Sequence, residues 1–288
     1  MKMGTTRSKK SEAGSQKNNL PRGFLLFASC LWLLWAQTTT PESLEALSWQ
    51  ARDALQAKQL DKAWQYADQT RKLALEELKK RSLDAEPHLP IALGAAIEVE
   101  SQVMGARGQR AEAIAFLKRQ LATYKTTSIA ARIQKNINLL GLEGKPAPPL
   151  TGHPSLAEFK GHPVLLFFWA HWCPDCKWEV PTLVRLMDHY STDGLVLIGP
   201  TQRYGYAAGG LTATPEQELE YIEEVRRKFY SPLPAMPAPV SEADFLTYGA
   251  STVPTLVLID KQGLVRMYHP GRMSYNDLAA QVEAVLRQ

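Results

Sequence analysis

Residues 167–181 read FFWAHWCPDCKWEVP, an apolar segment that leads into two closely spaced cysteines and then into a helix-like pattern. The apolar run begins at Pro163 and ends at Trp169, which is typical of a buried strand. Cys173 and Cys176 follow in a C-x-x-C spacing. We therefore expect the two cysteines to lie where a strand is followed by a helix.

This position predicts the chemistry of the two cysteines. Backbone N–H groups at a helix N-terminus are unpaired and form the positive end of the helix dipole, so a cysteine there is held partly as thiolate. Cys173 has that position, and thiolate is the form that attacks disulfides. Cys176 follows almost one helical turn later, close enough to attack a mixed disulfide on Cys173 and release the partner's thiol. The sequence thus predicts a dithiol–disulfide exchange site.

Composition limits the class of protein. The chain has 288 residues, of which 45% are hydrophobic and 22% charged, as in a globular protein of about two domains. The net charge is +4, but residues 1–40 contain six lysines and arginines against one glutamate, so the remainder is slightly acidic. The basic character belongs to this leader, and we expect no binding to nucleic acid.

The leader has the order of an export signal. A basic segment precedes an apolar core at residues 23–36, which is shorter than the roughly twenty residues that span a bilayer. We expect residues 1–40 to be a signal peptide, although Leu34 and Trp35 stand where a cleavage site prefers small residues, so an uncleaved anchor is the alternative. The protein is then exported, to a bacterial periplasm or the outer face of the cytoplasmic membrane, and contacts the membrane only through this segment.

The cysteine count supports an active-site role for the pair. Cys30 belongs to the leader, so Cys173 and Cys176 are the two cysteines beyond it. An exported chain with one remaining pair has no framework of structural disulfides. The pair is therefore predicted to be catalytic.

Residues 41–143 are predicted to form a helical domain, which begins with a cap, a proline and an acidic residue at Thr40, Pro41 and Glu42. Residues 60–67 and 110–117 both resemble the second helix of a tetratricopeptide-type hairpin, but their spacing is fifty residues rather than thirty-four. Either a partner-binding platform or a helical bundle that acts as a spacer fits this pattern. The expected helices are residues 41–58, 61–81, 90–104, 109–124 and 127–140.

Residues 144–288 are predicted to form an α/β domain. Residues 144–149, GKPAPP, cannot continue a helix and mark the boundary. Strand and helix patterns alternate after them, which predicts a mixed sheet with helices on both faces. The expected strands are residues 163–169, 194–199, 255–260 and 264–268, and the expected helices are residues 174–190, 215–229, 241–248 and 274–286.

The motifs of this domain resemble the thioredoxin fold and, within it, the exported TlpA/ResA-like thiol–disulfide oxidoreductases. The similarity is carried by residues 168–176, 253–255 and 258–263. It implies that Cys173 is the nucleophile, that Cys176 is the resolving thiol, and that the two form a redox-active disulfide with no other cofactor. It also implies that Pro254 is a cis-proline that turns the backbone of Val253 toward an extended substrate. Trp172 is expected in the apolar rim that contacts partners.

Two departures from the family pattern concern mechanism. Thioredoxins place a buried aspartate six residues before the first cysteine, where this chain has Phe167. Glu179 lies three residues after Cys176 and matches a glutamate of ResA-like proteins, so we expect it to move the resolving proton. A solvated surface glutamate is the alternative.

The second departure is Asp175, which stands where the family usually has proline. A carboxylate beside Cys173 destabilises its thiolate and favours the disulfide, so we expect a reductant of protein disulfides. His171 and Lys177 would act in the opposite direction if they were close to the sulfur.

Other site chemistries fit less well. His171, Cys173 and Cys176 could supply three metal ligands, but the chain has no second C-x-x-C, and we expect no metal. A peroxidatic Thr-x-x-Cys signature would need threonine where Ala170 stands. The two functional hypotheses are an oxidoreductase with protein thiol or disulfide substrates and an upstream electron donor, and a partner-binding helical module with a passive thioredoxin domain. The intact C-x-x-C and Pro254 favour the oxidoreductase.

Overall fold

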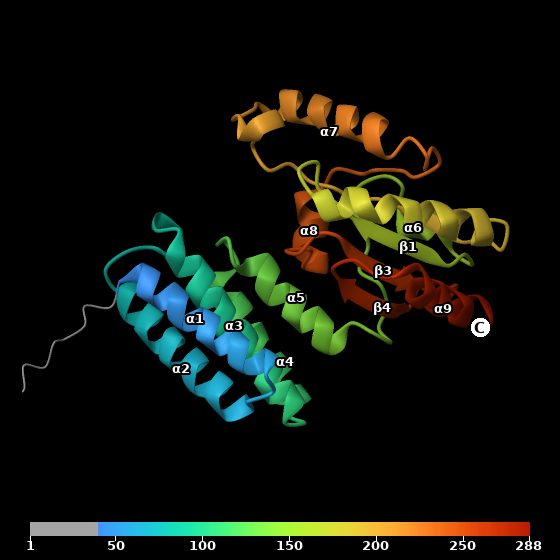
Figure 1. Ribbon diagram of the computed structural model, residues 1–288. Helices are drawn as coiled ribbons and strands as arrows, with labels where there is room; N and C mark the ends of the chain where they lie inside the picture. The colour runs from blue at the N-terminus through green and yellow to red at the C-terminus, as the bar shows by residue number, and fades with distance from the viewer. Residues whose placement is uncertain (1–39) are drawn as a thin grey trace, which may run out of the picture. The chain divides into compact units, whose positions relative to one another are not determined.

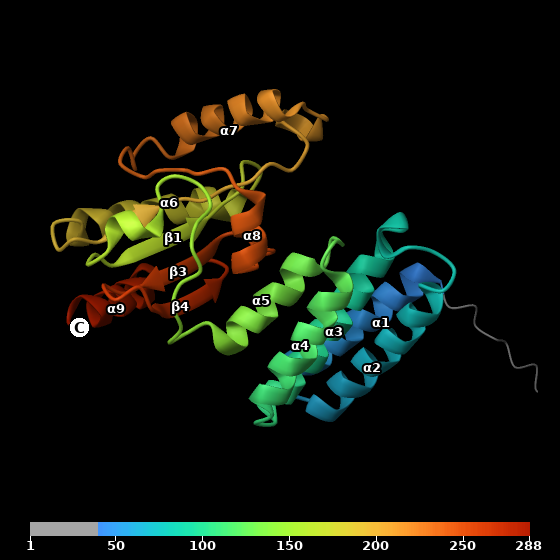
Figure 2. The same ribbon diagram turned by 180° about the vertical axis from the view of Figure 1, so that it is seen from behind.

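The computed structural model describes residues 40–288 (Figures 1 and 2). The predicted signal segment, with Cys30, lies outside these residues. Residues 40–288 group into one compact unit. None of the helices in this part of the chain combines the length and the apolar character that crossing a bilayer requires.

Five helices form the first part of the described chain, and the start of the first helix follows from local sequence. The side chains of Thr40 and Ser43 cap each other's backbone N–H groups, and Pro41 follows at the first helical position. The first helix ends at Gln56 because Lys58 adopts a left-handed φ of 58°. The five helices are α1 (Pro41–Gln56), α2 (Leu60–Glu77), α3 (His88–Ala106), α4 (Arg110–Tyr124) and α5 (Ala130–Gly141), with a short 3-10 turn at Leu83–Ala85.

Small residues let these helices pack closely. Ala51, Ala63 and Ala67 are fully buried where α1 and α2 meet α3, beside Val99 and Val103. Both views show α1, α2 and α3 side by side. The close packing of alanines agrees with helical hairpins in general, and the tetratricopeptide resemblance stays a prediction.

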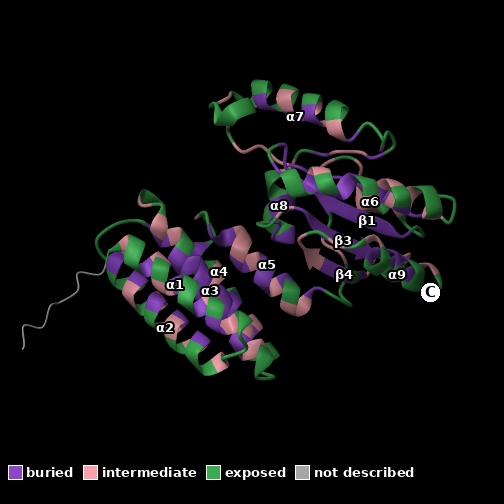
Figure 3. Cartoon of the chain, viewed as in Figure 1, coloured by how far each residue is buried: buried purple, intermediate pink, exposed green. Residues whose placement is uncertain are grey.

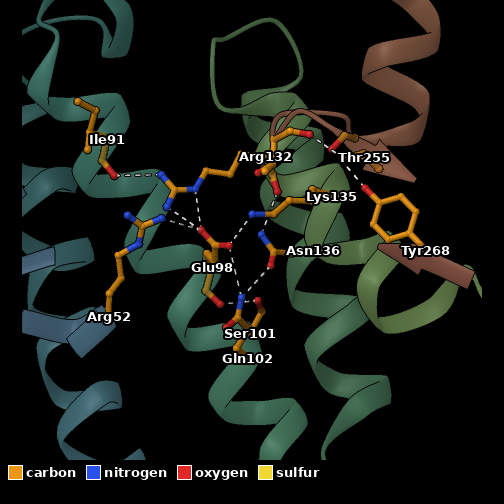
Figure 4. Close-up of polar contacts among 12 residues, drawn as sticks. Arg52, Ile91, Glu98, Ser101, Gln102, Arg132, Lys135, Asn136, Thr255 and Tyr268 are labelled. Carbon is orange, nitrogen blue, oxygen red and sulfur yellow. Dashed lines mark hydrogen bonds and ion pairs between the residues drawn. The ribbon is translucent and has the colours of Figure 1, made fainter. Parts of the chain in front are cut away.

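A buried charge cluster joins α1, α3 and α5 (Figure 4). Glu98 on α3 is 8% exposed and lies 2.6 Å from both Arg132 Nη2 and Lys135 Nζ on α5, and 3.7 Å from Arg52 Nη2 on α1. Burial opposes ionisation, but the charges of Arg132 and Lys135 outweigh it and lower the pKa of Glu98 to about 2. The carboxylate is therefore ionised and links three helices.

Helix α5 also contacts the second part of the chain. Asn138 Nδ2 donates to Thr247 O at 3.3 Å, near the end of α8 (Glu242–Tyr248). Gly249 follows with a φ of 62°, and a Cβ atom there would lie 2.2 Å from the backbone nitrogen of Lys135. This close approach of two backbones requires glycine.

The second part contains a four-stranded mixed sheet with the order β2-β1-β3-β4. The central strand β1 pairs parallel with β2 and antiparallel with β3, and β3 pairs antiparallel with β4. Leu166 on β1 lies opposite Ile198 on β2 and Val257 on β3. The strands are β1 (Val164–Phe168), β2 (Val196–Ile198), β3 (Thr255–Ile259) and β4 (Val265–Pro270).

Side chains of β1 alternate between two apolar cores, which confirms a sheet covered on both faces. Leu165 and Phe167 pack with residues of α6 (Pro174–Tyr190), α7 (Pro215–Phe229) and α9 (Tyr275–Leu286). Leu166 and Phe168 pack on the opposite face with α8 and with apolar residues of the 142–159 segment. Figure 3 shows the buried strands between partly exposed helices. The predicted thioredoxin-like fold, preceded by helices, is confirmed.

The segment expected to be a boundary pairs with the start of β4. Gly144 N donates to Val265 O at 2.8 Å, Val265 N donates to Lys145 O at 2.9 Å, and Ala147 N donates to Gly263 O at 2.9 Å. These bonds occupy the backbone of Val265, the first residue of β4, and of Gly263 just before it.

Candidate active site

The two predicted cysteines lie at the start of α6, directly beyond the end of β1. Cys173 is the N-cap residue, and its sulfur accepts a hydrogen bond from Cys176 N at 3.0 Å. Pro174 occupies the first turn, where a missing N–H costs nothing. A disulfide joins Cys173 and Cys176, which are 2% and 0% exposed. The pair therefore lies at the positive end of the α6 dipole.

The loop before β3 faces the disulfide. The Val253–Pro254 peptide bond is cis, and Val253 O lies 3.5 Å from Cys173 Sγ. Thr255 Oγ1 donates to Thr252 O at 2.6 Å and so bonds the two ends of this turn to each other. The structure thus brings Cys173, Cys176, Val253 and Pro254 together.

Trp172 lies at the border between this site and solvent. Its side chain is 44% exposed, and its ring meets the Tyr204 ring edge-on, with 5.5 Å between the centroids. Such an edge-to-face pair holds the exposed indole in a defined orientation.

Glu179 is buried rather than solvated. Its side chain is 0% exposed, and burial raises the pKa of its carboxyl group, although a bond from the Met273 backbone and the charge of Arg272 oppose the shift. Arg272 Nε, between β4 and α9, lies 3.4 Å from Glu179 Oε2, yet within residues 40–288 neither carboxyl oxygen has a well-aligned hydrogen bond. A buried carboxyl group with an elevated pKa is suited to exchange protons near neutral pH.

Sequence reasoning did not identify Arg272 or its position. The residue is 47% exposed, and its guanidinium also lies over the Trp178 ring at 5.8 Å. No motif signals it, because the contact joins segments almost a hundred residues apart. Phe167, in contrast, is fully buried against Tyr230, with ring centroids 6.1 Å apart, so it offers no proton-accepting group.

The sequence suggests His171 and Lys177 as positive charges near Cys173, and both contact residues of α7. Burial lowers the pKa of His171, and its Nε2 lies 3.1 Å from Oε1 of Glu218 on α7. Burial also lowers the pKa of Lys177, whose ammonium lies 4.6 Å from the centre of the Phe229 ring. Both side chains are thus directed toward α7.

Glu218 is a second residue that sequence reasoning missed. It is 1% exposed, although glutamate is rarely buried without a partner. Its position gives a signal, because Glu218, Ile222 and Val225 follow helical spacing and the last two form the buried face of α7. A charged residue on an apolar helix face indicates a partner inside the protein.

Comparison with known proteins finds relatives of the second part of the chain. Residues 147–268 match the AhpC/TSA family. A thiol:disulfide interchange protein DsbE from Xylella fastidiosa is 31% identical over 144 residues, which cover 46% of this chain and 64% of that protein. A thiol-disulfide oxidoreductase ResA from Geobacillus thermodenitrificans is 26% identical over 132 residues, which cover 45% of this chain and 67% of that protein.

Among solved structures, a thiol:disulfide interchange protein from Chlorobium tepidum aligns with 49% of this chain and 96% of its own, at 21% identity and a TM-score of 0.40. The chain spans less than two thirds of the length of the DsbE relative, and the sequence matches cover slightly less than half of the chain itself. The resemblance to thiol–disulfide oxidoreductases that was predicted from the C-x-x-C and Val-Pro-Thr motifs is confirmed by these matches, and residues 147–268 are similar to the AhpC/TSA family.

Proposed function

We propose that this protein is a thiol–disulfide oxidoreductase that reduces disulfides in other proteins. One observation carries the proposal: Cys173 caps α6, is bonded to Cys176, and faces the cis Val253–Pro254 bond. A purely passive docking domain would need none of these features. The names of the relatives from Xylella and Geobacillus describe the same reaction class.

The reaction starts from the dithiol form of the protein. The Cys173 thiolate attacks one sulfur of the substrate disulfide, which forms a mixed disulfide and releases the other substrate sulfur as a thiolate that takes up a proton. Cys176 then loses its proton and attacks Cys173, which forms the Cys173–Cys176 disulfide and releases the second substrate thiol. Two electrons pass from the protein to the substrate, and an upstream dithiol donor restores the reduced form.

Substrate binding follows from the surroundings of Cys173. An extended substrate segment would pair with the backbone of Val253, whose carbonyl oxygen lies beside the sulfur. Trp172 would cover the substrate next to its disulfide, since its indole is both exposed and oriented. Together these groups would hold the substrate disulfide beside Cys173.

Proton transfer in the second step is assigned to Glu179. Cys176 is fully buried, so its thiol pKa is raised and little thiolate forms without a base. Glu179 lies one helical turn further along α6 and is buried as well. Its carboxylate takes the Cys176 proton and later returns it to solvent or donor.

The direction of the reaction is that of a reductant. The thiolate of Cys173 is destabilised by the neighbouring Asp175, while His171 is buried against Glu218 and the Lys177 ammonium lies over Phe229. A less stable thiolate favours the disulfide form and makes the dithiol a stronger electron donor.

We also propose that the protein acts outside the cytoplasm, because residues 23–36 have the composition of an export signal and the chain beyond it has one cysteine pair. The helical region would present a surface to a partner protein. Both statements rest on sequence pattern, and fractionation of cells that express the full chain tests the first.

The activity is tested with insulin as a disulfide substrate and dithiothreitol as electron donor. The wild-type protein should accelerate insulin precipitation, and Cys173→Ser should reduce the rate to that of dithiothreitol alone. Cys176→Ser should accumulate mixed disulfides that identify the natural substrates. A Cys173→Ser variant as active as the wild type would refute the proposal.

A further inference from the structure

A buried hydrogen-bond network beside the redox site has no role in the chemistry above. Its centre is Glu218, which lies in the first turns of α7. Glu218 and His171 are each 1% exposed, and 3.1 Å separates Glu218 Oε1 from His171 Nε2. His171 is two residues before Cys173, so the network joins α7 to the active-site loop.

Glu218 accepts three hydrogen bonds, and each oxygen is used. Oε1 accepts from His171 Nε2 and from the backbone N–H of Tyr204, and Oε2 accepts from the backbone N–H of Gly205 at 2.8 Å. The backbone N–H groups of Tyr204 and Gly205 are donors, so both oxygens must act as acceptors. A glutamine would place an N–H₂ donor against one of these N–H groups, which the two acceptor oxygens of glutamate avoid.

The histidine is held in one protonation state. Nδ1 of His171 is buried without a hydrogen-bond partner in the described residues, so a proton on that atom would be unpaired. The neutral ring with its proton on Nε2 satisfies Glu218 and leaves an acceptor at Nδ1. The rings of Tyr204, Tyr206 and Tyr221 meet the imidazole edge-on at 5.6, 5.3 and 5.3 Å.

The network fixes the position of aromatic side chains at the edge of the site. Because Glu218 binds the backbone of Tyr204, it fixes the ring that meets Trp172 edge-on. It also bonds to the base of a small hairpin in which Tyr206 pairs with Thr212, and this hairpin carries Leu211, which is 72% exposed. Trp172 and Leu211 are both large exposed apolar residues.

We infer that Glu218 is a positioning residue that holds Tyr204 and His171 so that Trp172 and the 205–213 hairpin form a binding rim for polypeptide disulfides. The inference rests on the proposed function and deepens it, because it names the residue and the surface that select polypeptide substrates over small disulfides. A polypeptide chain extends past its disulfide and contacts the rim, whereas a small disulfide such as oxidised glutathione reaches Cys173 without it. Loss of Glu218 should therefore affect protein substrates selectively.

The test compares two substrates under single-turnover conditions. Reduced full-length protein, freed of donor, is mixed with a range of concentrations of insulin or of oxidised glutathione, quenched with acid, and its remaining thiols are counted. For Glu218→Gln, the half-saturating insulin concentration should rise roughly tenfold, as for loss of an interface anchor, while the limiting rate stays within about twofold. The glutathione rate should also stay within about twofold.

Two further variants keep the test decisive. Glu220→Gln alters an exposed glutamate on the same helix and should match the wild type with both substrates. Tyr204→Ala removes the ring but keeps the backbone N–H that Glu218 binds, and it should reproduce the insulin defect even if Glu218→Gln folds poorly. Hydrogen exchange should speed up at the amides of Tyr204 and Gly205 in Glu218→Gln but not in Glu220→Gln.

The outcomes distinguish a failure of the proposed function from a failure of the inference about Glu218. A wild-type protein that reduces neither substrate refutes the proposed function and this inference with it. Wild-type turnover combined with unchanged insulin saturation in folded Glu218→Gln and Tyr204→Ala refutes the inference alone. Equal losses with insulin and glutathione also refute it, because a rim acts on the larger substrate only.

Discussion

Replacing Glu179 with glutamine should separate the two chemical steps of the reaction. The side chain keeps its size, so packing around this fully buried position is preserved, but it can no longer accept a proton. Attack by Cys173 on a substrate does not use Glu179 and should change little. Attack by Cys176 on the mixed disulfide needs a base, and Phe167 supplies none on the other side of the site.

The size of the effect follows from the role of a base. A positioned general base contributes about 10²-fold or more to the rate. The second step should therefore slow by at least about 10²-fold, which corresponds to about 2.7 kcal/mol in activation free energy. In the wild type this step should slow as the pH falls through the raised pKa of Glu179, because protonation removes the base, and the variant should lack this dependence.

A stopped-flow measurement with a dithiobis(nitrobenzoate) disulfide resolves both steps. The first coloured thiolate is released by Cys173, and the second is released when Cys176 attacks the mixed disulfide. Asp188→Asn, an exposed substitution at the other end of α6, should behave as the wild type. If the second phase of Glu179→Gln keeps the wild-type rate between about pH 5 and 9, water and not Glu179 carries the proton.

Three predictions concern stability, and thermal or denaturant melting checks each. Because the folded state raises the pKa of Glu179 above 4.5, the wild type loses stability as the pH rises through that pKa. Glu179→Gln should therefore have a higher melting temperature than the wild type at pH 8 and lose this advantage near pH 4. Equal melting temperatures of the two proteins at both pH values would contradict the prediction. Glu98→Gln should lower the free energy of unfolding by about 3 kcal/mol, because two buried cations lose their partner. The stability of the wild type should fall as the pH drops from about 4.5 toward 2. A Glu98→Gln variant as stable as the wild type would contradict the prediction. Gly249→Ala should lower the free energy of unfolding by about 2 kcal/mol or more. Gly108→Ala is the control, because Gly108 has a φ of 79° and open space around it, and it should lower this free energy by about 1 kcal/mol. Equal losses in the two variants would contradict the close approach of Gly249 to Lys135.

The features that sequence predicted well depend on neighbouring residues. The helices at residues 174–190 and 215–229 begin and end where they were expected, because Cys173 and Thr214 cap them locally and each is followed by a proline. The strand at residues 163–169 shortened by one residue at each end. The sheet itself follows from alternation of strand and helix patterns, which persists over the whole segment.

The features that sequence did not predict depend on residues that are distant along the chain. Arg272 reaches Glu179, and Glu218 reaches His171 across 47 positions, so neither contact leaves a periodic pattern. The consequence for the site is electrostatic. Taken alone, His171 and Lys177 suggest positive charge near Cys173, but burial lowers the pKa of His171, and the Lys177 ammonium lies over the Phe229 ring.

Helix α5 shows why a domain boundary drawn from composition differs from one drawn from contacts. Gly144 and the prolines after it end the helical pattern, and the sequence therefore divides there. Lys135 nevertheless contacts residues on both sides of this boundary. Its ammonium binds Glu98 of α3, and its backbone lies against Gly249 after α8. The residues after α5 then pair with β4. The helical segment is thus joined to the redox segment on both sides of the expected boundary, and the loop that follows Gly249 leads to Val253 and Pro254. A change that displaces α5 is therefore expected to disturb the backbone that precedes the cis Val253–Pro254 bond.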